Sequence, residues 1–225
     1  IALNGTYLNL IKQIIFANNK IVEAKDFVSQ SREKIEVKIP LTAQTGKITI
    51  SNGLAEPILV ESENALSVTV SAITSVSPNP VKPGTNLTIE GTDLDLAKTV
   101  TLGGGKKATK IISTAANKVV LEVPADAQDG KVTLTMQSDV DVTSANAINT
   151  IVPSDITATP IPVKNGKVLS IAGKDLDLVT TVVFGGAKTG KITSQSETKI
   201  EVEVPKDATE GVATLNTRST KTVST

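Results

Sequence analysis

The chain has 225 residues, with 23 basic and 23 acidic side chains and neither cysteine nor histidine. A net charge of zero provides no attraction to nucleic acid or to an anionic membrane surface, so we expect neither partner. Without histidine and cysteine, the chain lacks the residues for a Ser-His-Asp triad, a Cys-His dyad or the usual zinc sites. No apolar run is long enough to cross a bilayer. We therefore expect no enzymatic activity, no cofactor and no membrane insertion by this segment.

One motif occurs three times along the chain. In each copy, an apolar strand leads to a glycine and then to a leucine flanked by two polar residues. In the second and third copies, a later strand ends in a pair of glycines. The aligned first glycines are Gly5, Gly91 and Gly173, which are 86 and 82 positions apart. Repeats of this size each form a small domain with its own core. The sequence therefore predicts three domains, at residues 1–71, 72–152 and 153–225.

The first repeat is predicted to contain strands at 35–39, 47–50 and 66–70. Residues 35–39 alternate apolar and charged side chains, which is typical of a half-buried strand. Ile1 aligns with Leu87, so no counterpart of 72–86 is present. We expect this domain to lack its first strand.

The second repeat is predicted to be complete. Strands are expected at 73–76, 87–90, 99–102, 119–123, 132–136 and 147–151. Pro78 and Pro80 forbid a helix, and residues 82–85 form a turn in which Gly84 adopts a positive φ. About seven short strands separated by turn signals every 8–12 residues or so indicate an immunoglobulin-like sandwich.

The third repeat follows the same order. Pro160 and Pro162 match Pro78 and Pro80, and residues 199–204 alternate most regularly. The chain stops at Thr225, which aligns with Ser144, so this repeat is expected to lack its closing strand. With both terminal domains incomplete, we expect the sequence to be a fragment of a longer protein.

A second signature places a proline six residues before a glycine in every repeat, at Pro40, Pro124 and Pro205. The proline ends one strand and the glycine begins the next turn, which predicts a corner of the sandwich. Together, the two signatures resemble the IPT/TIG family of immunoglobulin-like domains across essentially the whole chain. The resemblance implies an all-β fold of three tandem antiparallel sandwiches, the first and last incomplete. The first repeat departs from the pattern, with Ala17 and Asn18 in place of the glycine pair.

The resemblance also implies a setting. The chain is similar to tandem IPT/TIG arrays in surface proteins of Gram-negative bacteria, where such units hold a glycan-binding domain away from the outer membrane. It implies a non-enzymatic, extracellular spacer in an outer-membrane-anchored protein, whose partner is a glycan bound outside this segment or a surface protein. Two alternatives remain open. One is an adhesin segment that binds a protein through its loops, and the other is an accessory module of an extracellular polysaccharide-degrading enzyme.

Two aspartate pairs are the candidate site residues: Asp93 with Asp95, and Asp175 with Asp177. Paired carboxylates suit acid–base catalysis or calcium binding. The favoured interpretation is structural, with side-chain-to-backbone hydrogen bonds that shape the loop. We therefore assign no catalytic, metal or cofactor residue, and the ligand-binding residues stay unknown.

Other motifs are also interpreted as structural. The run 103–105 of three glycines leads to no helix, so it is not a phosphate-binding loop. The glycosylation patterns that begin at Asn4 and Asn86 are attributed to chance.

Aromatic residues are too few for a sugar-binding platform, which stacks rings on exposed Trp or Tyr. The chain has no Trp. Phe16 and Phe184 align with Leu102 and are predicted to be core residues. Only Tyr7 and Phe27 remain as candidates.

The joints between repeats are predicted to be stiff. Residues 70–73 contain no spare linker, and Pro153 restricts its predecessor to extended conformations. Three end-to-end units would reach on the order of 100 Å at about 3.3 Å per strand residue. We therefore expect an elongated array with limited bending.

Overall fold

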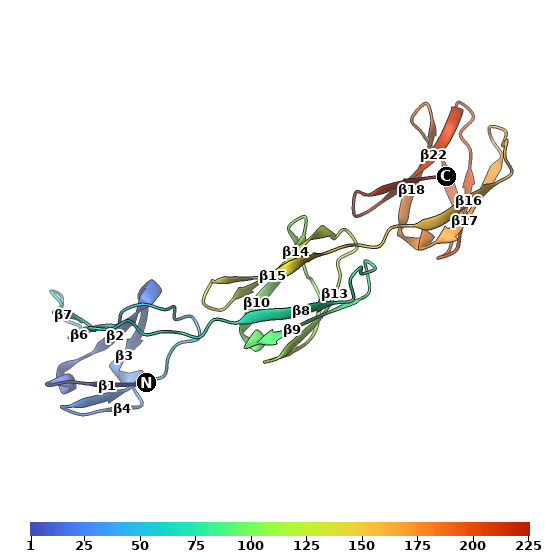
Figure 1. Ribbon diagram of the computed structural model, residues 1–225. Coiled ribbons are helices and arrows are strands. Elements are labelled where there is room, and N and C mark those ends of the chain that lie inside the picture. Colours follow the sequence, from blue (N-terminus) through green and yellow to red (C-terminus); the bar gives the residue numbers. More distant parts are fainter. The chain divides into compact units, whose positions relative to one another are not determined.

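A computed structural model describes all residues, 1–225, and its strands form six antiparallel sheets. The sheets pair into three sandwiches, which we call sandwich 1 (strands β1–β7), sandwich 2 (β8–β15) and sandwich 3 (β16–β23) (Figure 1). Five 3-10 helices are the only helical elements, and none has the length and hydrophobicity needed to cross a membrane. The all-β expectation is confirmed. The domain boundaries at 71/72 and 152/153 stay a prediction.

Sandwich 1 consists of the sheets β1-β5-β4 and β3-β2-β6-β7. Its elements are β1 (Ala2–Asn4), η1 (Leu8–Leu10), β2 (Gln13–Phe16), η2 (Ala17–Asn19), β3 (Lys20–Glu23), η3 (Ala24–Asp26), β4 (Ser29–Gln30), β5 (Lys34–Glu36), β6 (Thr49–Ser51) and β7 (Leu59–Glu61).

Sandwich 2 consists of the sheets β12-β13-β9-β8 and β11-β10-β14-β15. Its elements are β8 (Ala72–Ser77), β9 (Asn86–Thr92), η4 (Leu94–Leu96), β10 (Ala97–Gly103), β11 (Lys106–Lys107), β12 (Ile111–Ala115), β13 (Lys118–Glu122), β14 (Gln128–Met136) and β15 (Asp141–Ile148).

Sandwich 3 repeats this topology with the sheets β20-β21-β17-β16 and β19-β18-β22-β23. Its elements are β16 (Ser154–Thr159), β17 (Val168–Lys174), η5 (Leu176–Leu178), β18 (Val179–Gly185), β19 (Lys188–Thr189), β20 (Lys191–Gln195), β21 (Lys199–Glu203), β22 (Thr209–Thr217) and β23 (Thr222–Ser224). The expectation that this repeat lacks its closing strand is therefore corrected, because β23 pairs with β22 as β15 pairs with β14.

By contacts, the chain divides into two compact units. One comprises 1–71, 96–98 and 135–141, and the other comprises 72–95, 99–134 and 142–225. The second unit contains sandwich 3 and most of sandwich 2, so the contacts between these two sandwiches lie within one unit.

The alternating strands build each core. In β13, Val119 and Leu121 are fully buried, and they lie opposite Ile89 and Leu87 of β9. Phe16 and Phe184 are buried in their cores, like Leu102 in sandwich 2, as the repeat alignment predicts. Because successive strand residues point to opposite faces, the alternate residues Lys118, Val120 and Glu122 are exposed or half-buried.

The predicted corner has the same geometry in all three sandwiches. The N–H of the alanine three residues after the proline donates to the proline carbonyl, at 2.9 Å, 3.0 Å and 3.2 Å for Ala43, Ala127 and Ala208. In sandwich 1, a Cβ on Gly46 would lie 2.6 Å from the Ala17 side chain. Since Ala17 replaces a glycine of the other repeats, Gly46 provides the room that this side chain needs.

One expectation for sandwich 1 is corrected. Residues 66–70 do not form a strand; Leu66 makes only an isolated bridge with Gly46, and the strand beside β6 is β7. Within 66–70, the N–H of Val68 donates to the Thr45 hydroxyl at 3.0 Å instead of to a neighbouring strand. The loop after β2, where the sequence lacks the glycine pair, places Asn18 and Asn19 at positive φ.

Candidate functional site

The most elaborate polar cluster lies where sandwich 2 meets sandwich 3. The connecting segment is held closely: Thr150 and Pro153 are buried, and Thr150 forms a parallel bridge with the fully buried Val81. The N–H of Val81 donates to the Asn149 carbonyl at 2.8 Å, and the N–H of Ile151 donates to the Val81 carbonyl at 2.9 Å. The segment that leaves sandwich 2 is therefore fixed to the turn that begins at Lys82.

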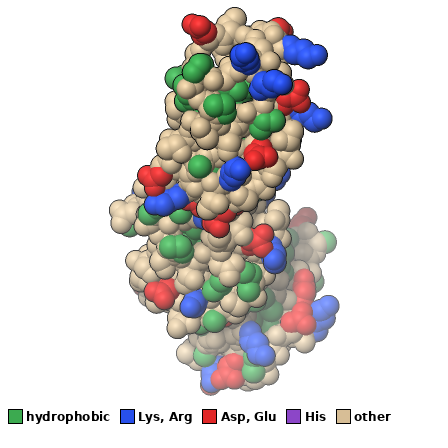
Figure 2. Space-filling model, turned by 90° about the vertical axis from the view of Figure 1, so that its right-hand side faces the viewer, with side chains coloured by type: hydrophobic (Ala, Val, Ile, Leu, Met, Phe, Trp, Pro, Cys, Tyr) green, Lys and Arg blue, Asp and Glu red, His purple; other side chains and the backbone are tan.

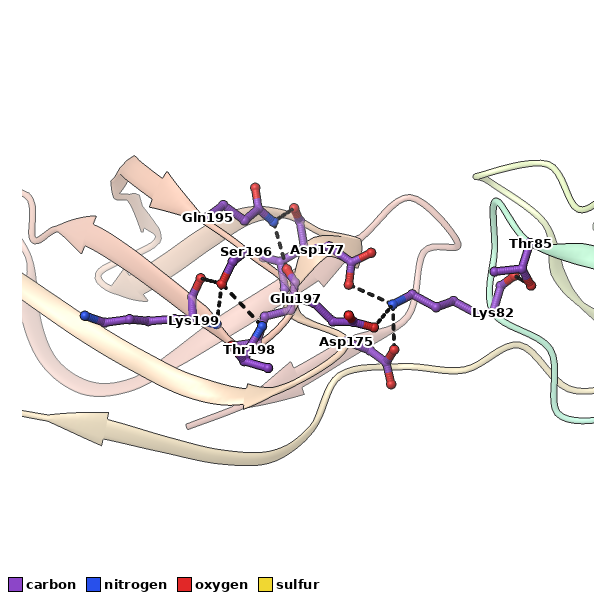
Figure 3. Close-up of polar contacts among 11 residues, drawn as sticks. Lys82, Thr85, Asp175, Asp177, Gln195, Ser196, Glu197, Thr198 and Lys199 are labelled. Carbon is purple, nitrogen blue, oxygen red and sulfur yellow. Dashed lines mark hydrogen bonds and ion pairs between the residues drawn. The ribbon is translucent and has the colours of Figure 1, made fainter.

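Lys82 extends from this turn into a group of three carboxylates on sandwich 3 (Figure 3). Its Nζ lies 2.8 Å from Asp175 Oδ1, 3.0 Å from Asp177 Oδ1 and 2.7 Å from Glu197 Oε1. Asp175 and Asp177 come from the loop around η5, and Glu197 comes from the turn between β20 and β21. We call these four residues the Lys82 cluster.

The Lys82 cluster favours a charged lysine. Burial alone would lower the pKa of Lys82, but hydrogen bonds to Asp175, Glu197 and Asp177 outweigh it and raise the pKa well above its ordinary value. The Lys82 side chain is 18% exposed, whereas Glu197 is 67% exposed. Charge-assisted hydrogen bonds of this length are stronger than neutral ones, although salt weakens the exposed member most.

A second polar contact joins the same two sandwiches. Lys221 of sandwich 3 donates to Asp129 Oδ1 at 2.7 Å and to the Thr150 carbonyl at 3.0 Å. The Thr150 N–H and hydroxyl donate to the same Asp129 oxygen at 2.7 Å and 2.9 Å. Burial raises the pKa of Asp129, but the hydrogen bonds from Lys221 and Thr150 outweigh this effect, so that its pKa is lowered overall.

This contact should stabilise the folded state less in acid, where the Asp129 carboxylate becomes protonated. A carboxyl group whose pKa is lower in the folded state stabilises that state above its unfolded pKa, near 3.8 for Asp129, and the stabilisation is lost as pH falls through the folded value. We expect the NMR titration midpoint of the Asp129 carboxyl to lie below 3.8 and to rise in Lys221→Met. Asp126, which pairs with Lys106, serves as the control and should not move. An unchanged Asp129 midpoint in the variant would contradict the contact.

A cleft of about 450 Å³ is lined by residues of both sandwiches. Pro83 and Ala125 line it from sandwich 2, and Asp177, Gln195 and Arg218 line it from sandwich 3. The Gln195 amide donates to the carbonyls of Leu176 and Val179 at 2.8 Å each. This side chain therefore supports the loop that carries the aspartates.

The backbone and the side chain of the aspartates in these loops have different roles. Asp93 and Asp175 adopt left-handed backbone conformations, with φ of 53° and 54°, and Tyr7 does so at the aligned position with φ of 60°. Aspartate tolerates this region better than most residues. The expected capping hydrogen bond from Asp175 to its loop is absent, because that carboxylate pairs with Lys82 instead.

Calcium binding was the other role considered for the aspartate pairs. Carboxylate oxygens of Asp175, Asp177 and Glu197 lie within 4.8 Å of one another, a spacing that one cation could bridge. The Lys82 ammonium group occupies that position among them. The geometry therefore describes an ion-pair cluster within the protein.

The glycine run has a packing role. A Cβ on Gly103 would lie 2.2 Å from the Gln128 carbonyl oxygen, so glycine permits β10 and β14 to approach closely. Gly104 and Gly105 both have φ of 70°, which suits a tight turn.

The aromatic candidates differ in exposure. Phe27 is partly buried against the core of sandwich 1. Tyr7 is 58% exposed, and the Arg32 guanidinium lies 4.5 Å from the centre of its ring. Basic and acidic side chains are interspersed over the face drawn in Figure 2, in agreement with the balanced composition.

Sequence reasoning did not identify Lys82 and Glu197 as site residues. The sequence does contain a repeated lysine at this position, because Lys82 and Lys164 each lie two residues before a turn glycine, Gly84 and Gly166. Glu197 has no such signal, since its counterpart in sandwich 2 is an alanine.

Comparison with known proteins identifies one family and several similar structures. The IPT/TIG domain family matches residues 71–151 and 147–224. No curated protein matches the chain.

Three solved structures illustrate the similarity. A surface glycan-binding protein from Prevotella bryantii, PbSGBP-B, is 16% identical over 71% of this chain and 42% of its own, with a TM-score of 0.35. The mixed-linkage glucan locus SGBP-B of Bacteroides ovatus is 18% identical over 99% of this chain and 59% of its own, with a TM-score of 0.32. A tetra-tandem repeat from the extending region of a large adhesion protein is 19% identical over 96% of this chain and 64% of its own, with a TM-score of 0.31. The chain thus spans about half the length of the two glycan-binding proteins.

Proposed function

Since the chain belongs to the IPT/TIG domain family, with matches over 71–151 and 147–224, we propose that it is a non-enzymatic spacer segment of a cell-surface protein. The spacer would hold a binding domain, outside these residues, at a distance from its anchor. Its partner would be a glycan or a surface protein bound by that domain. The surface setting and the outer-membrane anchor are part of this proposal.

The observation that carries the proposal is the joint between sandwiches 2 and 3. A spacer works through length and stiffness, and domains joined by flexible linkers move independently by default. Here a connecting segment with Thr150 and Pro153 buried is combined with the Lys82 cluster and the Asp129–Lys221 contact. These interactions join sandwich 3 to sandwich 2 at more than one place, as a stiff joint requires.

The proposed partner assignment follows from the surface chemistry. Sugar-binding platforms use exposed aromatic rings, and Tyr7 is the chain's single tyrosine, with Arg32 over its ring. We therefore propose that glycan recognition, where the full protein has it, belongs to a domain outside this segment.

Small-angle X-ray scattering tests the spacer function. We expect a radius of gyration well above the ~17 Å of a single globule of this length, with a profile that changes little between low and moderate salt. A compact particle near ~17 Å would contradict the spacer. A large value with a strongly salt-dependent profile would contradict the stiff joint.

A further inference from the structure

The loop that carries Asp175 and Asp177 has an unfavourable arrangement. The backbone of Asp175 is left-handed, with φ of 54°, which is costly for a residue other than glycine. Carboxylate oxygens of Asp175, Asp177 and Glu197 lie within 4.8 Å of one another, and like charges at this distance repel. Such an arrangement persists only where the surrounding structure holds it in place.

Backbone hydrogen bonds hold the equivalent loop in every sandwich. The N–H of the first residue of the 3-10 helix donates to a carbonyl of the nearby hairpin turn, at 2.9 Å, 2.8 Å and 2.8 Å for Leu8, Leu94 and Leu176. These bonds attach η1, η4 and η5 to their turns in the same way. Because all three sandwiches have them, they do not account for the convergence of carboxylates in sandwich 3.

Sandwiches 1 and 3 add a side-chain clamp to these backbone bonds. Gln195 Nε2 donates to the carbonyls of Leu176 and Val179 across η5, at 2.8 Å each (Figure 3). In sandwich 1, Gln30 Nε2 makes the same pair of hydrogen bonds across η1, also at 2.8 Å. In the strand register, the same position of sandwich 2 is Thr114, which has one hydroxyl donor on a shorter side chain. The clamp is therefore an addition to the shared fold.

The clamp and the third carboxylate belong to the same turn. Gln195 is the last residue of β20, and Glu197 follows two residues later. The Ser196 hydroxyl accepts the N–H of Lys199 at 3.0 Å and so shapes this turn, and Ser31 makes the equivalent bond in sandwich 1. The turn that presents Glu197 therefore also holds the loop that presents the two aspartates.

Sandwich 1 has the same clamp with different side chains around it. The positions of Asp175, Asp177 and Glu197 are occupied there by Tyr7, Asn9 and Arg32. The Arg32 guanidinium lies over the Tyr7 ring, and none of the three residues is acidic. The clamp thus fixes the shape of the loop, and the three side chains placed on it determine what the loop accepts.

We propose that Gln195 is a positioning residue for the joint between sandwiches 2 and 3. Its two hydrogen bonds hold the η5 loop so that Asp175 and Asp177 converge with Glu197 and form the acceptor for Lys82. A preformed acceptor has fewer groups to order when the lysine binds, which strengthens the contact. The inference rests on the proposed stiff joint and adds the residue on which its charged contact depends.

The test replaces Gln195 with methionine, which is similar in size and cannot donate to the two carbonyls. Hydrogen bonds to carboxylates slow proton exchange of an ammonium group, so the ammonium signal of Lys82 in a nitrogen-edited NMR spectrum reports on the cluster directly. We expect this signal in the unmodified chain and its loss in Gln195→Met. The alignment tensors of sandwiches 2 and 3, measured from residual dipolar couplings, should diverge in the same variant. A Lys82 signal that persists with unchanged tensors would overturn the inference.

Gln30→Met is the matched control, because it removes the same pair of hydrogen bonds in sandwich 1. It should leave the Lys82 signal and the tensors of sandwiches 2 and 3 unchanged, and loss of the signal in this control would overturn the inference. Gln195→Thr, which copies the residue that sandwich 2 has at this position, replaces Gln195→Met if the methionine variant does not fold.

A second background shows whether Gln195 acts through Lys82. In Lys82→Met, the further change Gln195→Met should leave the tensors as they are, and an additional divergence would overturn the inference. Tensors that already differ in the unmodified chain would instead contradict the proposed stiff joint. In that case, the Lys82 signal would still decide whether Gln195 positions the carboxylates.

Discussion

Replacing Leu121 with alanine is expected to lower the free energy of unfolding of sandwich 2 by about 2–5 kcal/mol. Leu121 is fully buried in β13 and lies opposite Leu87, which is also fully buried. The variant loses the transfer free energy of the leucine side chain and leaves a cavity that the two sheets close only in part. In a domain of this size, the melting temperature should fall by about 10 °C or more.

A matched control lies in the neighbouring strand. Ile111 of β12 is the cross-strand partner of Leu121 but is 42% exposed, so Ile111→Ala should cost about 1 kcal/mol or less. Thermal unfolding is followed through NMR signals of sandwich 2, which separates its transition from the others. Equal losses for the two variants would show that β13 does not form the core as described.

The second large effect is expected from Lys82→Ala. This change leaves Asp175, Asp177 and Glu197 close together without their cation, so mutual repulsion should loosen the joint between sandwiches 2 and 3. We expect the joint to weaken by about 1–2 kcal/mol, at the low end for charged hydrogen bonds because two of the carboxylates are exposed. The sandwiches themselves should stay folded.

The readout is the relative motion of the two sandwiches, measured as the difference between their alignment tensors from residual dipolar couplings. Lys110→Ala is the control, because it removes an exposed ion pair with Glu122 inside sandwich 2. The tensors should diverge in Lys82→Ala and stay together in Lys110→Ala. If the two tensors stay the same in Lys82→Ala, the Lys82 cluster does not stiffen the joint.

The sequence predicted the all-β fold because strand periodicity and corner turns are local properties. Alternation at 199–204 corresponds to β21, and the proline–alanine–glycine spacing corresponds to the same corner turn in all three sandwiches. The predicted strand at 66–70 was wrong: the Val68 N–H donates to the Thr45 hydroxyl at 3.0 Å, and only Leu66 pairs, in an isolated bridge with Gly46. Such a side-chain contact cannot be read from strand periodicity.

The candidate site was predictable only in part. The recurrence of the aspartate pairs pointed to their loop, and their left-handed conformations explain why aspartate suits it. Lys82, however, is separated from Glu197 by 115 positions and belongs to another sandwich. Which lysine meets which carboxylates depends on how one sandwich packs on the next, and no local pattern contains that information.

We propose that the connecting segment and the Lys82 cluster hold sandwiches 2 and 3 as one stiff body. The most direct test is the alignment tensors of the two sandwiches in the unmodified chain. We predict that residual dipolar couplings from both fit a single tensor of the same magnitude and orientation. Two tensors of clearly different magnitude would show independent motion and contradict the claim.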